Sequence, residues 1–202
     1  MKTKEKIIKA AVNEFSEKGF HGGRVENIAR SAGVNKALIF YYYSSKEILY
    51  GIVLRTILKE LFDELNKKGV IRPSVTPEEF IDKFPDIYIN FFVKNTGFLK
   101  IIGLELIRDP ENFREKLKDA LDSSIKLTPV NLQGVISEWY QDGKITESDP
   151  VHFFMNIASL CIFPIIFRPV PEAIFGMNFD ETEFVKKRIE SVKNILRGGI
   201  LR

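Results

Sequence analysis

Apolar residues recur along this chain at the spacing of three and four residues that is typical of amphipathic α-helices. The first such run places Ile7, Ala11 and Phe15 on one helix face, and Gly19 follows where that helix is expected to end. The sequence has no sustained alternation of apolar and polar residues, the pattern that indicates half-buried β-strands. The chain is therefore predicted to be all-α.

Several helix starts are marked by a capping residue that precedes a proline. The side-chain oxygen accepts an N–H group of the first turn, and proline suits the first helical position because no N–H is needed there. These pairs are Thr76-Pro77, Asp109-Pro110, Thr128-Pro129 and Asp149-Pro150. Capping-box patterns run from Ser44 to Glu47 and from Asp180 to Glu183. The signals predict helices near residues 45–68, 77–95, 97–107, 110–126, 129–142, 150–167 and 181–197, with Pro85 kinking or splitting the second.

Two short helices joined by a glycine turn are predicted between Val25 and Leu49. Gly33 permits the positive φ angle that a sharp turn requires. Asn35 can cap the following helix over residues 36–42. This order of helix, turn and helix is the helix-turn-helix pattern, in which the second helix enters the major groove of DNA.

The charge is unevenly divided along the chain. Residues 1–48 contain nine Lys and Arg against five Asp and Glu, an excess of +4, whereas the remainder carries −1. A basic patch of this kind attracts phosphate backbones, although a merely solvated basic face gives the same count. Charge alone leaves these two interpretations open.

The segment from Lys6 to Leu49 resembles the TetR family of one-component repressors. The resemblance rests on Gly19-Phe20, on the run from Ile28 to Val34, and on the aromatic cluster 40–43 followed by Ser-Lys-Glu at 45–47. It implies a helix-turn-helix DNA-binding head of three helices over residues 1–48. It also implies a larger helical body for ligand sensing and dimerisation over residues 49–202.

The resemblance assigns DNA-binding roles within the head. It places Lys36, Ala37, Leu38 and Tyr41 at the base edges or the groove floor, and Tyr42 and Lys46 at phosphates. Four consecutive aromatic residues cannot all face one side of a helix, so at least one tyrosine hydroxyl is expected near solvent or DNA.

Two departures from the family pattern concern operator recognition. Gly22-Gly23-Arg24 replaces the usual Thr or Ser cap of the second helix. Arg24 is expected to supply a phosphate contact instead, and Gly23 to expose its N–H group. Leu38 stands where many members have Thr, so its base contact would be apolar.

Aromatic residues cluster in the body. Core packing explains most of them, but the resemblance also implies an apolar effector pocket. Phe84, Tyr88 and Trp139 are the candidate ligand-binding residues, because the last two combine an apolar ring with a polar group. The implied effector is a small apolar or amphipathic molecule that releases the repressor from its operator.

The last helix has an apolar stripe that must be buried on its own body or on a second chain. The resemblance implies a homodimer formed by the helices near 150–167 and 181–197. A two-fold dimer matches the two half-sites of a palindromic operator in double-stranded DNA.

Other functions are less well supported by the sequence. Only His21 and His152 are present, Cys161 is the single cysteine, and no phosphate-binding loop or metal-ligand spacing occurs, so no catalysis, cofactor or metal is predicted. Glu105 lies in an apolar run and is expected to be a paired helix residue rather than a perturbed carboxylate. A helical carrier without DNA binding would explain the body but not the helix-turn-helix pattern.

The most apolar segment, residues 151–167, raises the question of a membrane span. Its 17 residues include polar side chains and Pro164, whereas a spanning helix needs about 20 apolar residues. We therefore expect a buried helix and no membrane association. A lone cysteine and the lack of a signal-peptide pattern favour a cytoplasmic location.

Overall fold

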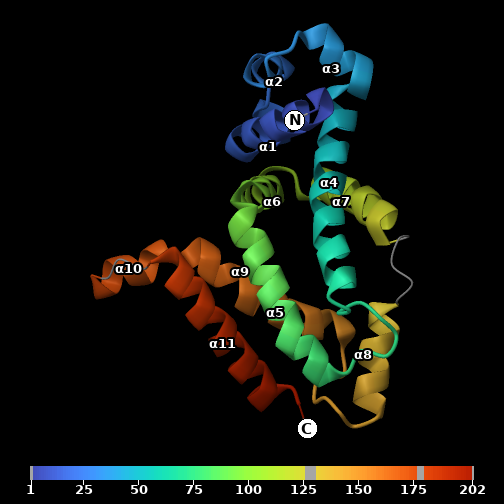
Figure 1. Cartoon of the computed structure of the whole chain (residues 1–202), viewed down its shortest axis with the longest axis vertical. Helices are drawn as coiled ribbons and strands as arrows, with labels where there is room; N and C mark the ends of the chain where they lie inside the picture. The colour runs from blue at the N-terminus through green and yellow to red at the C-terminus, as the bar shows by residue number, and fades with distance from the viewer. Residues whose placement is uncertain (1, 126–130, 177–179, 202) are drawn as a thin grey trace. The chain divides into compact units, whose positions relative to one another are not determined.

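The computed structural model describes residues 2–125, 131–176 and 180–201, which form helices with no β-strand among them (Figure 1). The helices are α1 (Thr3–Gly22), α2 (Val25–Ala32), α3 (Lys36–Tyr43), α4 (Lys46–Lys67), α5 (Pro77–Lys94), α6 (Thr96–Arg108), α7 (Pro110–Ile125), α8 (Leu132–Gln141), α9 (Pro150–Phe167), α10 (Pro169–Phe175) and α11 (Glu181–Gly199). The prediction of an all-α chain is confirmed.

Most of the predicted helix caps are present. Asp149 accepts the Val151 N–H at 2.7 Å, and Asp180 accepts the Glu183 N–H at 2.9 Å. Thr76 accepts the Glu79 N–H at 3.2 Å. The Asp109 carboxylate likewise lies 3.4 Å from the amide nitrogen of Asn112. Side-chain oxygens therefore begin these helices as the sequence predicted.

Other predicted helix boundaries are wrong. The cap of α4 is Ser45, which accepts the Ile48 N–H at 3.2 Å, whereas Ser44 ends α3 with a φ of 59°. Pro85 lies inside α5 without splitting it. The short helix α10 was not predicted. The Thr128-Pro129 pair lies outside the described residues, and α8 is capped by Asn131.

The chain divides into two compact units. Unit 1 comprises residues 1–62 and 95–127, and unit 2 comprises residues 63–94 and 128–202. In unit 1, α1 packs on α2 and α6, whereas in unit 2, α5 packs on α9 and α11. This division follows packing; the functional boundary after residue 48 stays a prediction.

Aromatic rings hold the core of each unit. In unit 1 the Phe15 ring meets the Tyr50 ring edge-on at 5.0 Å between centroids. In unit 2 a four-residue repeat along α5 makes a continuous ladder of rings, with neighbouring centroids 4.7–4.8 Å apart. The ladder consists of Phe80, Phe84, Tyr88 and Phe92. Such pairs add to the stabilisation gained from burial.

A side chain of α11 completes the backbone hydrogen bonding of α9. Pro164 has no N–H group, so it cannot donate to the carbonyl of Leu160 one turn earlier. The Arg188 guanidinium donates to that carbonyl instead, from Nε at 3.0 Å and from Nη2 at 2.7 Å. Arg188 therefore attaches α11 to α9 at the proline.

We expect Arg188→Leu to lower the free energy of unfolding by about 1–3 kcal/mol, because it leaves the Leu160 carbonyl without a donor. Urea unfolding followed by circular dichroism measures this loss. The control is Lys187→Leu, which removes only an exposed ion pair to Glu183. Equal losses in the two variants would contradict the role given to Arg188.

Candidate nucleic-acid interface

The predicted turn between α2 and α3 has the expected geometry. Gly33 adopts a left-handed conformation with a φ of 67°, and Val34 donates its N–H to the carbonyl of Ala29 at 3.0 Å. Asn35 caps α3 by accepting the Leu38 N–H at 2.7 Å. The helix-turn-helix arrangement follows from these local contacts.

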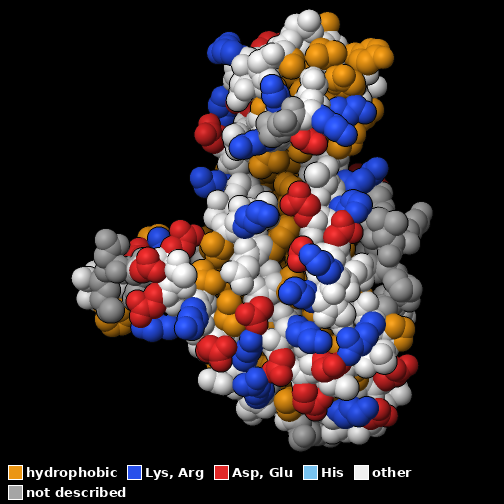
Figure 2. All heavy atoms as spheres, in the orientation of Figure 1, with side chains coloured by type: hydrophobic (Ala, Val, Ile, Leu, Met, Phe, Trp, Pro, Cys, Tyr) orange, Lys and Arg blue, Asp and Glu red, His pale blue; other side chains and the backbone are white. Residues whose placement is uncertain are grey.

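The two sides of α3 differ sharply in exposure. Ile39 and Tyr43 are buried, so one side of α3 packs on the rest of unit 1. On the other side Ala37 is exposed and Tyr41 is 80% exposed. Figure 2 shows hydrophobic side chains gathered over the part of unit 1 where α3 lies. The expectation that the aromatic run splits between core and solvent is confirmed.

The predicted phosphate-binding and base-contacting cations lie at helix starts: Arg24 before α2, Lys36 at the start of α3 and Lys46 at the start of α4. Arg24 and Lys36 are exposed, and Lys36 forms a 2.5 Å ion pair with Glu26. Lys46 donates to the carbonyl of His21 at 3.2 Å. An exposed ion pair contributes little net free energy, so Lys36 can exchange Glu26 for a DNA acceptor at low cost.

Leu38 and Tyr42, also predicted at this interface, are half-buried. The ammonium group of Lys4 lies 5.2 Å from the centre of the Tyr42 ring. Lys4 was not among the predicted residues, although its position in the basic N-terminal run was visible in the sequence. It brings a further cation to the tyrosine expected to contact phosphate.

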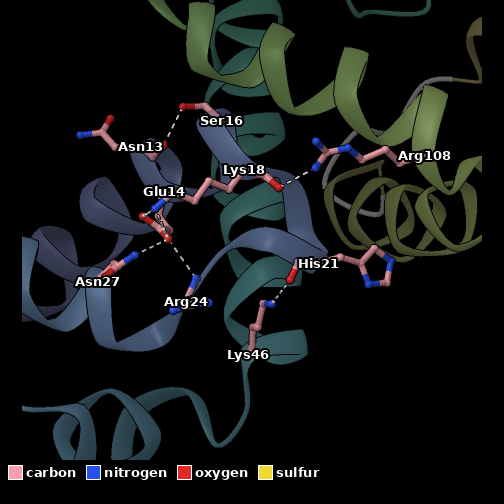
Figure 3. Close-up of polar contacts among 9 residues, drawn as sticks. All are labelled: Asn13, Glu14, Ser16, Lys18, His21, Arg24, Asn27, Lys46 and Arg108. Atoms are coloured by element: carbon pink, nitrogen blue, oxygen red, sulfur yellow. Dashed lines mark hydrogen bonds and ion pairs between the residues drawn. The ribbon is translucent and has the colours of Figure 1, made fainter.

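Glu14 holds the segment that begins α2, where no side chain caps the helix (Figure 3). Its carboxylate accepts the Arg24 N–H at 3.0 Å, the Asn27 side-chain amide at 2.9 Å and the Lys18 ammonium at 3.1 Å. Burial alone raises the pKa of Glu14, but these three hydrogen bonds outweigh burial and hold the pKa below its usual value. An ionised carboxylate of α1 thus fixes the start of α2.

The expectation that Gly23 exposes its N–H group is wrong. That group donates to the carbonyl of Gly19 at 3.1 Å. Gly23 is also buried, and a Cβ there would lie 2.7 Å from the ring of Phe15. Glycine is therefore required for close packing at this position.

The end of α1 is held by polar side chains of α6. Glu105, only 1% exposed, accepts the Phe20 N–H at 2.6 Å. Arg108 donates to the carbonyl of Lys18 at 2.7 Å (Figure 3). Gly19 has a non-helical backbone with a positive φ of 68°, which kinks α1 before its last residues up to Gly22. Glu105 is thus a paired helix residue, as expected, and its partner is a backbone amide.

Two of the three predicted ligand-binding residues line a cavity in unit 2. The cavity has a volume of about 290 Å³ and lies among α5, α8 and α9. Phe84 and Trp139 line it, whereas Tyr88 does not. Tyr88 is buried in the ring ladder of α5, and burial raises the pKa of its hydroxyl. The remaining lining residues are Phe80, Leu132, Gln133, Ile136, Pro150, Val151, Phe153, Phe154 and Ile157.

Helix α9 is not the buried helix that the sequence predicted. Its buried residues are Phe153, Ile157 and Cys161, while other large apolar side chains such as Met155 and Ile166 are exposed. Pro150–Phe167 is long and apolar enough to cross a membrane by length and composition, which by itself is weak evidence for a span. The exposed apolar side of α9 requires a covering partner.

Comparison with known proteins identifies the family. The family model described as "Bacterial regulatory proteins, tetR family" matches residues 7–51 of this chain. The transcriptional regulator RutR of Escherichia coli K12 is 29% identical over 98% of this chain and 90% of its own length. The transcriptional repressor NicS of Pseudomonas putida is 30% identical over 80% of this chain and 75% of its own. The chain belongs to the TetR family.

Similarity of fold extends through the body. The transcriptional regulator FadR of Bacillus subtilis, solved in complex with stearoyl-CoA, aligns with a TM-score of 0.66 at 21% identity. The alignment covers 96% of this chain and 98% of FadR. This likeness shows that the fold of the body is shared; the transcriptional-regulator function of this chain rests on the family match and on the regulators RutR and NicS.

Proposed function

We propose that this TetR-family protein is a repressor that a small molecule releases from a palindromic operator. The observation that carries the proposal is the exposed side of α3, presented by a capped helix-turn-helix whose other side is buried. Arg24, Lys36, Ala37, Leu38, Tyr41, Tyr42 and Lys46 are the proposed DNA-contacting residues. Their positions on and beside α3 suit groove and phosphate contacts.

A homodimer through α9 and α11 is part of the proposal. Members of the family act as dimers, and both helices expose apolar residues here, including Met155, Ile166 and Ile195. Pairing these surfaces with those of a second copy would remove them from water. A two-fold dimer presents two α3 helices to successive major grooves.

The cavity in unit 2 is the proposed effector site, with Phe84 and Trp139 in its wall. The wall includes the first turns of α9, so a bound molecule contacts a helix of the proposed dimer interface. A ligand changes DNA affinity only by favouring one conformation of the dimer, with typical factors of about 5–150. Because the target is chromosomal DNA, we place the protein in the cytoplasm, with no enzymatic role.

The test is a binding titration against genomic DNA fragments that include the promoter of the protein's own gene, at two salt concentrations. Wild type should bind one fragment preferentially, with affinity that falls steeply as salt rises. The Tyr42→Ala/Lys46→Ala variant should bind more weakly. Because it loses one lysine, the slope of log affinity against log salt concentration should become shallower by about one.

The matched control makes the same two substitutions in unit 2, at Tyr140 and Lys144, both exposed. It should bind DNA like wild type. If a folded wild-type dimer binds no fragment, with or without candidate ligands, the repressor proposal falls. The cavity would then favour a helical carrier that has no DNA-binding role.

A further inference from the structure

We propose that the cavity among α5, α8 and α9 takes an uncharged aromatic molecule of about two rings. This inference rests on the proposed function, since it names the chemical class of the effector for the same site. It depends on three features of the wall: its lack of charge, its volume and its aromatic rings.

The cavity offers no partner for a charge. Among the described residues that line it, none is Asp, Glu, Lys, Arg or His, and Gln133 is exposed. The indole N–H of Trp139 is already used, because it donates to the carbonyl of Val75 at 3.1 Å. No lining atom is a buried polar group that lacks a partner. The cavity is open to solvent where Gln133, Val151 and Phe154 are exposed, so an ionised group loses water without gaining a partner wherever the wall encloses it.

The volume sets the size of the guest. An apolar cavity of about 150 Å³ holds one benzene molecule, so the 290 Å³ here suit about two rings. A long acyl chain with a nucleotide head, such as the stearoyl-CoA bound to FadR, has many more atoms than this volume accepts. Fold similarity to FadR therefore does not carry its ligand to this chain.

Aromatic rings form much of the wall. Phe80 is 5.7 Å from Trp139 and 6.0 Å from Phe153 between ring centroids, in edge-on and tilted arrangements. Trp139 also meets Phe153 edge-on at 6.1 Å. Rings at these angles present both faces and edges, which a flat aromatic guest can match by stacking and edge-to-face contact. A purely aliphatic guest gains only the burial of its surface.

The test is calorimetric titration of the full-length protein, without DNA, with three probes. Naphthalene is uncharged and has two rings, 2,6-naphthalenedicarboxylate has the same rings with a charge at each end, and decanoate is a charged aliphatic chain. The dicarboxylate cannot keep both charges in solvent when its rings are buried. Naphthalene should bind at least about tenfold more tightly than either anion.

Filling the cavity should remove this binding. Val151→Phe adds volume from an exposed lining position, so the variant should fold normally, and it should weaken naphthalene binding by about tenfold or more. The control is Val170→Phe on α10, the same substitution at an exposed position outside the cavity. It should bind naphthalene like wild type.

Three results would overturn the inference: no saturable naphthalene binding, an anion that binds as tightly as naphthalene, or a Val151→Phe variant that binds like wild type. The DNA titration tests the repressor role separately. A wild type that binds its operator but prefers the dicarboxylate would keep that role and reject the ligand class. A wild type that binds naphthalene but no DNA would keep the ligand class and reject the repressor role.

Discussion

Ala37→Glu should abolish sequence-preferring DNA binding while leaving the fold intact. Ala37 is exposed near the start of α3, where a glutamate side chain meets no steric obstacle and interacts favourably with the helix dipole. In the DNA complex the same carboxylate would lie at the groove among phosphates. Like charges brought together at an interface cost several kcal/mol, so we expect an affinity loss of at least about 100-fold.

Fluorescence anisotropy on the preferred operator fragment measures this loss, and circular dichroism checks that the helical content is unchanged. Ala173→Glu on α10 is the matched control, since it places the same charge at an exposed helical position in unit 2. It should bind like wild type. An Ala37→Glu variant that retains operator affinity would show that α3 is not the helix in the groove.

The helix-turn-helix could be predicted because its determinants are local. Gly33 sets the turn, Asn35 caps α3 three residues before the N–H it accepts, and Ile39 recurs at core spacing. Each of these signals acts within one or two helical turns, so its spacing in the sequence directly reports its geometry.

The contacts that hold the head together could not be predicted, because they join residues far apart in the sequence. Glu14 fixes the start of α2 by accepting hydrogen bonds from the Arg24 N–H and the Asn27 side chain, although it belongs to the preceding helix. Glu105 meets the Phe20 amide across 85 residues. A glutamate in a helical pattern looks the same whether it faces solvent or a distant N–H group, so periodicity does not identify such contacts.

In the body, the sequence pattern likewise does not identify which apolar residues line the cavity and which are covered by other parts of the protein. Phe84 and Tyr88 occupy successive turns of α5, yet only Phe84 lines the cavity. The apolar run of α9 predicts a buried helix, although much of its surface is exposed in the single chain. Apolar sequence shows that a surface must be covered, but it does not say whether the cover is the same chain, a ligand or a second copy.

Glu105→Ala should lower the free energy of unfolding by about 1–3 kcal/mol, because it leaves the Phe20 N–H buried without an acceptor. Glu105→Gln keeps an oxygen of similar shape and should lose less. Urea unfolding measures both variants. Equal losses in the two would show that the carboxylate charge, rather than the hydrogen bond to Phe20, supplies the stability.

A double-mutant cycle with Gly19 tests the same contact from α1. A Cβ at Gly19 would lie 2.7 Å from Glu105 Oε1, so Gly19→Ala alone should suffer both this clash and the strain of a positive φ. In the Glu105→Ala background the clash with Oε1 is gone, while the 3.2 Å approach to Arg108 Nη1 and a backbone strain of about 1–3 kcal/mol remain. The two losses should therefore be non-additive by about 0.5–3 kcal/mol, and strict additivity would mean that the two residues do not interact.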